Sequence, residues 1–234
     1  MIKNFDKKNC QDLVLLFHIL DNYGISDLTA NHASVLSNDK KSFYINQHKH
    51  LFSQVKISNL IKIDINNKNK DLIKKVNLAG YNIHKYLHQS NRKPKWILHT
   101  HSELGVAISC LKEGFITRLN QSSARFHGMV EYINYGSMAT LESEAKKIAK
   151  KTKKKTSLII LKNHGVIILA DTIDELHHLT FHFEKCSKIQ LSLLTNKKKI
   201  NLISNKLATL TAKQHKSFGP IGKLSWQAIK NKFK

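Results

Sequence analysis

Hydrophobic residues recur along this chain with the period of amphipathic helices over several long stretches. Apolar residues three or four positions apart predict helices at residues 9–23, 77–88 and 139–155, the last with Leu141 facing inward. The run Thr172-Ile173-Asp174-Glu175 matches a capping box, and we expect the helix that it begins to reach about Leu194.

Shorter apolar runs between these helices predict strands. Residues 43–46 and 60–65 have strand character, whereas residues 26–35 are rich in turn formers and predict a turn. Residues 158–169 contain two apolar runs around Lys162-Asn163-His164-Gly165. Because Asn and Gly favour turns, this pattern predicts a β-hairpin with His164 near its tip.

Length and composition indicate a globular protein. A chain of 234 residues with 41% hydrophobic content fits one domain spanning residues 1–234. No apolar run approaches the roughly 18–20 residues that cross a bilayer, and the N-terminus lacks the apolar core of a signal peptide. We therefore expect a cytoplasmic protein without a membrane span. Three widely spaced cysteines indicate reduced thiols, with Cys110 and Cys186 in the core.

The net charge of +23 comes from 39 Lys and Arg residues against 16 Asp and Glu residues. A surface so basic can attract nucleic acid, anionic membrane or phosphorylated metabolites. However, nearly all the basic residues are lysines, with little aromatic interleaving and no nucleic-acid motif. The pattern favours a solvated Lys-rich surface over dedicated nucleic-acid binding.

Within residues 95–110, an apolar strand runs directly into His99-Thr100-His101. Side chains two apart on a strand point to the same face, so these two imidazoles can aim at one point. A catalytic zinc site needs one more protein ligand, and His164 is the third ligand that we expect. With 14 histidines, roughly one H-x-H pair arises by chance, and His48-Lys49-His50 is another. The alternative is therefore a pair of strand-end histidines held by ordinary hydrogen bonds.

These stretches resemble the class II aldolase and adducin family. WILHTHSELGVAIS, followed some sixty residues later by LIILKNHGVIILADTIDEL, is similar to the family's strand-end H-x-H and later N-H-G histidine, which bind a divalent metal, usually zinc. DLTANHASV, VNLAGYNIHKYLH and FHFEKCSKIQ also fit, and the resemblance covers roughly residues 10–195. It implies an α/β fold, namely a three-layer α/β/α sandwich with a mainly antiparallel central sheet, assembled as a homotetramer.

The resemblance is closer to the adducin-like branch than to the sugar-phosphate aldolases. In those aldolases an acidic residue nineteen positions before the first H-x-H histidine moves a proton, and counting back from His99 reaches Gly80. Leu78 and Ala79 also replace the small hydroxyl-bearing residues that hold substrate phosphate. A positioned acid or base contributes about 10²–10⁴-fold in rate, so aldol cleavage without a replacement should be slow.

Two residues are candidates for the missing proton carrier. Glu103 is the nearest carboxylate after His101, although a helix N-terminus also favours acidic residues for electrostatic reasons. His84 lies on the segment that precedes the site, and its alternative interpretation is a core or interface histidine.

Further residues are candidates for substrate binding because the resemblance places them near the site. Asn31, His32 and Ser34 occupy positions of a family turn that helps to hold substrate, with ordinary turn residues as the alternative. Lys49 falls in a loop near the family's substrate, where it could meet an anionic group or remain solvated.

Two functional hypotheses follow. The first is a metal-dependent lyase of the class II aldolase type, acting on a small hydroxy-carbonyl or sugar-phosphate substrate, in which a divalent metal such as Zn²⁺ stabilises an enediolate. The second is a non-catalytic adducin-like interaction or scaffold protein, for example one that binds the cytoskeleton. Gly80 favours the second hypothesis, whereas the complete trio His99, His101 and His164 favours the first, to which we lean.

Overall fold

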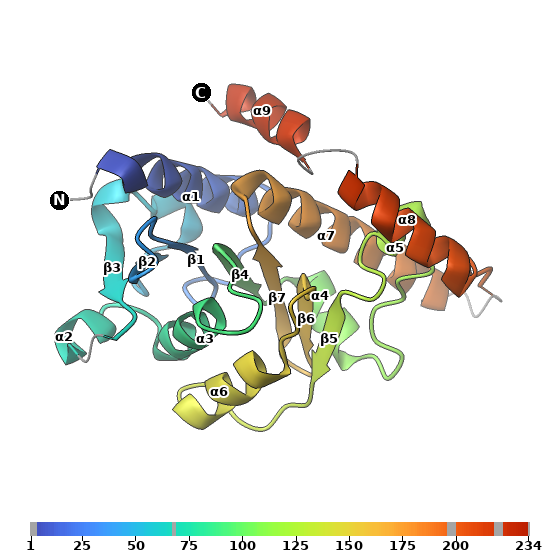
Figure 1. The fold of residues 1–234 in the computed structure, drawn as a ribbon, viewed down its shortest axis with the longest axis horizontal. Coiled ribbons are helices and arrows are strands. Elements are labelled where there is room, and N and C mark those ends of the chain that lie inside the picture. The colour runs from blue at the N-terminus through green and yellow to red at the C-terminus, as the bar shows by residue number, and fades with distance from the viewer. Residues whose placement is uncertain (1–3, 67–68, 196–199, 218–221, 234) are drawn as a thin grey trace.

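One sheet organises the protein. The computed structural model describes residues 4–66, 69–195, 200–217 and 222–233 (Figure 1). The strands are β1 (His32–Leu36), β2 (Ser42–Asn46), β3 (Leu60–Asp64), β4 (Trp96–Thr100), β5 (Val130–Ile133), β6 (Leu158–Leu161) and β7 (Gly165–Ala170). They form a seven-stranded sheet of order β3-β2-β1-β4-β7-β6-β5. Each neighbouring pair is antiparallel except β5 and β6, so the predicted mainly antiparallel α/β fold is confirmed.

Helices cover both faces of the sheet. They are α1 (Asn4–Asn22), α2 (Lys70–Ile73), α3 (Leu78–His88), α4 (Glu103–Cys110), α5 (Gln121–Ala124), α6 (Glu142–Lys151), α7 (Ile173–Thr195), α8 (Asn205–Ser217) and α9 (Lys223–Lys232), with 3-10 turns at Phe52–Gln54 and Ile57–Asn59. Helices α1 and α7 lie over one face, and α3 and α6 lie over the other (Figure 1). This arrangement gives the three predicted layers.

Strand β4 is buried on both faces and therefore determines where the histidines point. Trp96 and Leu98 pack into the core beneath α1 and α7, whereas Ile97 packs beneath α3 and α6. Because successive strand side chains alternate between faces, His99 continues the row of Ile97 toward α3. The same alternation places His101 on that side, just beyond the end of the strand.

Some local predictions were wrong. Residues 32–36 form strand β1 and not a turn, because Ala33 and Val35 join the α1 core while the alternate polar side chains are buried against α3. Leu141 is 59% exposed, since α6 begins only at Glu142. Cys110 is exposed at the last residue of α4, whereas Cys186 is buried as expected.

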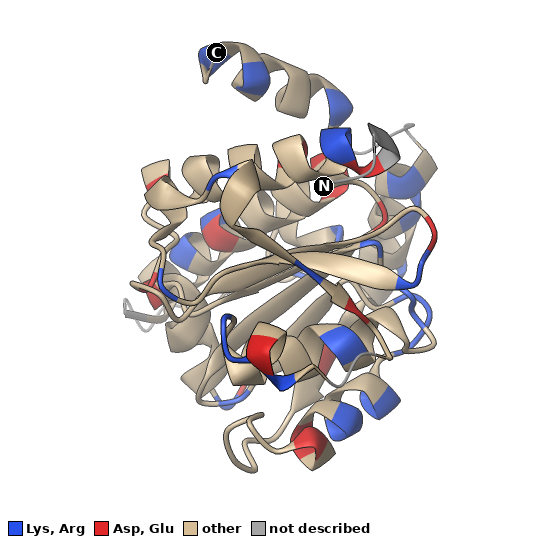
Figure 2. Ribbon diagram, turned by 90° about the vertical axis from the view of Figure 1, so that its left-hand side faces the viewer, with Lys and Arg blue, Asp and Glu red and all other residues tan. Residues whose placement is uncertain are grey.

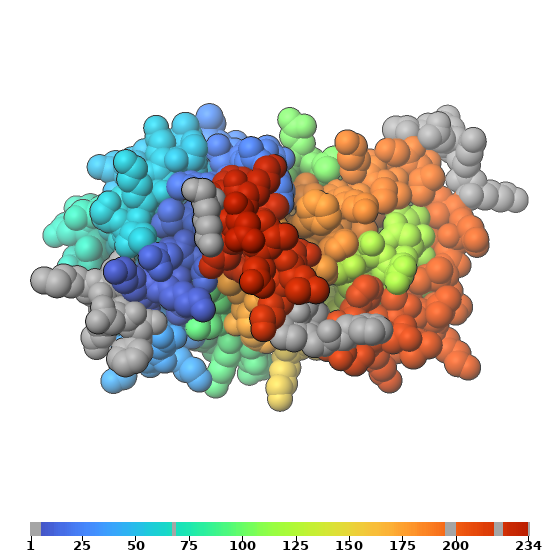
Figure 3. Space-filling model, turned by 90° about the horizontal axis from the view of Figure 1, so that it is seen from above, coloured from blue at the N-terminus to red at the C-terminus, as the bar shows by residue number. Residues whose placement is uncertain are grey.

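Of the two C-terminal helices, α9 packs on the α1 and α7 layer, whereas α8 packs against α5. Trp226 of α9 is buried, and Lys230 Nζ lies 2.8 Å from Asp12 Oδ1 of α1, so the first and last described helices are in contact (Figure 3). Lys and Arg residues are spread over helices and loops around the molecule (Figure 2). Among the helices that the structure describes, none combines the length and the apolar character needed to cross a membrane.

Candidate metal centre and active site

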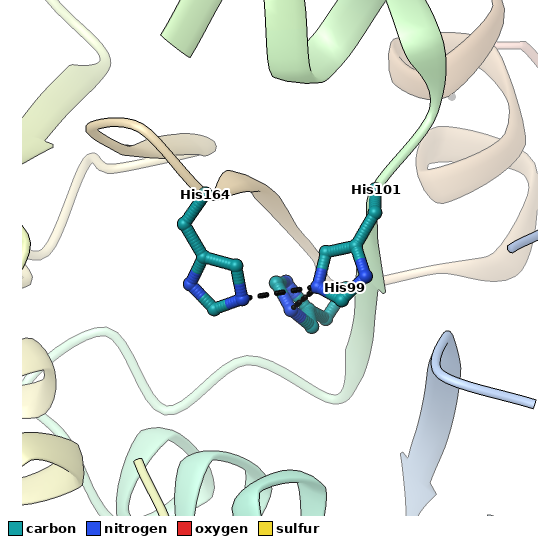
Figure 4. A group of neighbouring side chains, drawn as sticks. All are labelled: His99, His101 and His164. Carbon is teal, nitrogen blue, oxygen red and sulfur yellow. Dashed lines mark hydrogen bonds between the residues drawn. The ribbon is translucent and has the colours of Figure 1, made fainter. Parts of the chain in front are cut away.

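Three imidazoles meet at the carboxyl end of β4 (Figure 4). His101 Nε2 lies 2.9 Å from His99 Nε2 and 3.0 Å from His164 Nε2. His99 belongs to β4, His101 follows it directly, and His164 lies in the loop between β6 and β7. The structure thus brings together three side chains that the sequence suggested as metal ligands.

The outer nitrogens of two of these rings have acceptors as partners. His99 Nδ1 lies 3.0 Å from the carbonyl oxygen of Val166, and His101 Nδ1 lies 3.0 Å from Asp27 Oδ2. A carbonyl and a carboxylate can only accept, so both Nδ1 atoms carry the proton. The Nε2 atoms of His99 and His101 therefore face each other as lone-pair donors.

This donor set fits a divalent cation. Burial lowers the pKa of His99 well below its usual value, and burial together with His101 lowers the pKa of His164 to about 4, which favours neutral rings. Lone pairs about 3 Å apart repel one another unless a proton or a cation lies between them. Tetrahedral zinc bound at 2.0–2.1 Å would place its nitrogen ligands about 3.3 Å apart, close to the separations of 2.9 and 3.0 Å observed here.

The hairpin that carries His164 is held close to β4 by local features. Asn163 at its tip adopts a left-handed conformation with φ +59°. Ser109 of α4 accepts hydrogen bonds from the backbone N–H groups of Asn163 and His164. A Cβ atom on Gly165 would lie 2.6 Å from the carbonyl oxygen of Thr100, so glycine permits this close approach of the strands.

Asn31 lies behind the candidate metal centre and contacts its backbone. Its side-chain oxygen accepts a hydrogen bond of 2.9 Å from the backbone N–H of His101, and its amide donates to Thr100 Oγ1 at 3.4 Å. Asn31 is 1% exposed and is not among the residues that line the pocket. Its observed contacts therefore orient the ligand-bearing backbone.

A pocket of about 840 Å³ opens beside the three imidazoles. Asp27 and His32 line it, and Lys74 supplies a cationic side chain. Exposed Tyr135 and Met138 line it as well. The pocket thus combines polar groups at the candidate metal centre with apolar surface around them.

The other predicted site residues lie at different distances from this pocket. Of these, His32 lines it, whereas Ser34 and His84 are fully buried beyond His32. Lys49 is exposed and lines a neighbouring cavity of about 590 Å³. Glu103 is exposed at the start of α4 and does not line the pocket.

Three residues of the site region were not predicted from the sequence. Asp27 partners His101 from 74 residues away, and Lys74 lines the pocket. Glu184 accepts a 2.6 Å hydrogen bond from Ser102, which caps α4 immediately after His101, and burial raises the pKa of Glu184 to about 7. Asp27 could have been singled out as the acidic residue in the turn-rich segment ahead of Asn31.

Comparison with known proteins finds relatives that align with most of this chain. The sequence profile described as Class II Aldolase and Adducin N-terminal domain matches residues 11–191. A Pseudomonas aeruginosa protein, whose name places it provisionally in aldolase class 2, is 26% identical over 227 residues, covering 94% of this chain and 87% of that protein. Alpha-adducin of Rattus norvegicus is 25% identical over 191 residues, covering 79% of this chain but 25% of that protein.

Two solved structures share the fold at 24% identity. An aldolase II superfamily protein from Pseudomonas syringae has a TM-score of 0.87, with 99% of this chain and 94% of that chain covered. L-fuculose 1-phosphate aldolase from Glaciozyma antarctica PI12 has a TM-score of 0.78, with 99% and 93% covered. The profile match over residues 11–191, with the shared fold, shows that this chain belongs to the class II aldolase and adducin family.

Proposed function

We propose that this protein is a divalent-metal-dependent enzyme of the class II aldolase type, acting on a small hydroxy-carbonyl compound or a sugar phosphate. The proposal rests on the convergence of three imidazole nitrogens. His101 Nε2 lies 2.9 Å from His99 Nε2 and 3.0 Å from His164 Nε2. Three imidazole ligands and one open position are typical of catalytic zinc, which we propose as the metal.

A divalent cation at this position would supply a Lewis acid that stabilises negative charge developing on a substrate oxygen. The chain's own residues would orient the ligands and the substrate. Asp27 accepts a hydrogen bond from His101 Nδ1–H and so holds that ring in place. Lys74, on the pocket wall, can pair with an anionic group such as a phosphate.

The substrate class is supported by the size of the pocket and by a structural neighbour. A volume of about 840 Å³ lies within the range of small-molecule sites. The neighbour named L-fuculose 1-phosphate aldolase takes a sugar phosphate by its name, and we extend that class to this chain. Leu78 and Ala79 stand where the family's phosphate-binding residues are expected, so an unphosphorylated hydroxy-carbonyl compound is an equal candidate.

Gly80 limits the proposed reaction, because it offers no side chain to move a proton. Loss of a positioned acid or base lowers rates by about 10²–10⁴-fold, so we expect slow carbon–carbon cleavage unless another group takes this role. Glu103 and His84, our two sequence candidates for that role, do not line the pocket.

A non-catalytic adducin-like interaction protein is the second candidate function. Gly80 favours it, as does the relationship to alpha-adducin over 79% of this chain. An interaction module does not require three pre-oriented imidazoles, so we place the enzyme first.

Metal analysis of the purified protein tests the proposal. We expect about one metal ion per chain in the wild type and almost none in the His99→Ala/His101→Ala variant. The matched control is His48→Ala/His50→Ala, which removes an H-x-H pair of the same spacing and should keep the metal. Metal-free protein in all three cases, with unchanged folding, would refute the metal centre.

Turnover separates the two candidate functions. We expect a panel of sugar phosphates and keto acids, assayed with added zinc or manganese, to reveal at least one substrate whose turnover is lost in the His99→Ala/His101→Ala variant. Absence of turnover throughout, together with tight binding to a cytoskeletal protein, would favour the interaction module.

We further propose that residues 1–234 form one domain that works in the cytoplasm as a homotetramer, without nucleic acid as a partner. Exposed apolar side chains at Tyr135, Met138, Leu207 and Leu210 are available for contacts between subunits. Light scattering would show a mass four times the 26.8 kDa of the chain.

A further inference from the structure

The ring of His32 fills the space beside Gly80. A Cβ atom on residue 80 would lie 2.7 Å from His32 Cδ2 and 2.9 Å from His32 Nε2, closer than real Cβ atoms approach. The pairing of β1 with β4 places His32 directly opposite His99, and His32 lines the pocket. The missing side chain at residue 80 therefore makes room for an imidazole next to the candidate metal centre.

A chain of buried hydrogen bonds leads away from this imidazole. His32 Nδ1 lies 2.8 Å from His84 Nε2, and His84 Nδ1 lies 2.5 Å from Ser34 Oγ. Ser34 Oγ lies 2.8 Å from His88 Nε2, and His88 Nδ1 lies 2.9 Å from the carbonyl oxygen of Pro94. These four side chains are at most 4% exposed.

Helix and strand geometry explain why these side chains meet. Residues four apart on a helix are about 6 Å apart along its axis, and residues two apart on a strand are separated by about 6.6 Å. His84 and His88 of α3 therefore match His32 and Ser34 of β1 in spacing. The polar residues of β1 that suggested a turn are instead paired with one face of α3.

The carbonyl oxygen of Pro94 sets the direction of every bond in this chain. It can only accept, so His88 Nδ1 carries the proton and His88 Nε2 accepts from the Ser34 hydroxyl. Ser34 Oγ then accepts from His84 Nδ1, and His84 Nε2 accepts from His32 Nδ1. The remaining His32 Nε2 is left unprotonated, and it has no hydrogen-bond partner among the described residues.

These directions hold for neutral imidazoles, and the surroundings favour that state. Burial, as the largest cause, lowers the pKa of His84 well below its usual value and lowers the pKa of His88 to about 4. No carboxylate contacts either ring in the described structure; the partners of these rings are serine, histidine and a carbonyl group.

We propose that His32 Nε2 accepts a hydrogen bond from a hydroxyl group of the substrate, and that His84, Ser34 and His88 are positioning residues that keep it an acceptor. The inference rests on the proposed function, because it assigns a substrate group to the same pocket. On this inference, the pocket prefers substrates that carry a hydroxyl group beside the group that would bind the metal.

Histidine nitrogen NMR tests the direction of these hydrogen bonds without any ligand. Long-range proton–nitrogen spectra of the ¹⁵N-labelled protein, assigned with single histidine variants, should show protonated Nδ1 and unprotonated Nε2 in His32, His84 and His88. In Ser34→Ala, His32 should begin to populate the form with protonated Nε2. Protonated Nε2 in wild-type His32 would overturn the inference, and so would a charged ring at any of the three positions.

A pair of chelators tests the substrate contact. Acetohydroxamate and glycolohydroxamate share the metal-binding group, but only the second carries an additional hydroxyl. We expect titration calorimetry on zinc-loaded protein to show a preference for glycolohydroxamate that falls roughly 3–10-fold in Ser34→Ala. The matched control is Ser187→Ala, since Ser187 is equally buried and its hydroxyl has no partner in the described structure.

Failure of this inference is distinguishable from failure of the proposed function. If zinc and both hydroxamates bind but Ser34→Ala keeps the wild-type preference, the contact with His32 is refuted while the metal centre stands. If zinc does not bind, the proposed function and the substrate contact fail together. The NMR spectra of the metal-free protein still decide which ring nitrogens of His32, His84 and His88 carry the protons.

Discussion

Two H-x-H pairs of identical spacing occur in this chain, and they end in different surroundings. His99 and His101 lie at the end of a central buried strand, where Val166 and Asp27 hold their outer nitrogens. The pair at 48 and 50 lies in a turn after β2, and neither ring makes a hydrogen bond within the part of the chain that the structure describes. His48 nevertheless lines the same pocket.

The difference shows what turns a spacing into a candidate metal centre. Strand geometry points two side chains to one face, but a ring that rotates freely must lose rotamer entropy before it can bind. An outer hydrogen bond to a carbonyl or carboxylate holds the ring and keeps its proton away from the metal side. The pair at the end of β4 has both the strand geometry and the outer hydrogen bonds, whereas the pair in the turn has neither.

The largest test of this comparison is the effect of zinc on stability. With free zinc at about 1,000 times Kd, a ligand that binds only the folded state adds about 4 kcal/mol to the free energy of unfolding. Urea unfolding with zinc or with EDTA should show this gain in the wild type and in His48→Ala/His50→Ala. His99→Ala/His101→Ala should show almost none. Equal gains in the two double variants would remove the distinction between the pairs.

A change at Asp27 should make His101 more like the histidines in the turn. Asp27→Asn keeps an oxygen acceptor but removes its charge, so we expect zinc affinity to fall about 10–100-fold, or about 1.4–2.7 kcal/mol. Competition with a chromophoric chelator measures the affinity. Asp64→Asn is the matched control, since Asp64 is an exposed carboxylate that accepts a backbone hydrogen bond at the end of β3. Unchanged affinity in Asp27→Asn would mean that β4 alone orients the ring.

The features that the sequence predicted well depend on short stretches of chain. Strand β4, the hairpin around His164 and helix α7 follow from apolar runs, turn formers and a capping residue within a few positions of one another. The three imidazoles could be proposed as a set because two belong to one strand and the third sits at the tip of a tight turn. The family resemblance then joined the two segments.

The features that the sequence did not predict depend on contacts between distant segments. His32 and Ser34 read as turn residues because the helix that pairs with them lies 50 residues or more further along the chain. Asp27 is 74 residues from His101, so no local pattern connects them. Gly80 indicated a lost acid, and only the packing of α3 on β1 reveals that its missing side chain makes room for His32.

The smallest test concerns the turn that carries the third ligand. Asn163 adopts φ +59°, where a residue with an ordinary side chain costs roughly 1–2 kcal/mol, asparagine less and glycine nothing. Asn163→Ala should therefore lower the free energy of unfolding by about 1 kcal/mol, whereas Asn163→Gly should leave it within about 0.5 kcal/mol, as measured by urea unfolding in EDTA. Because the chelator removes any metal contribution, the difference between the two variants reports backbone strain alone. Equal losses in both would instead assign the stability of the turn to the Asn163 side chain, and His164 would then depend on that side chain for its position.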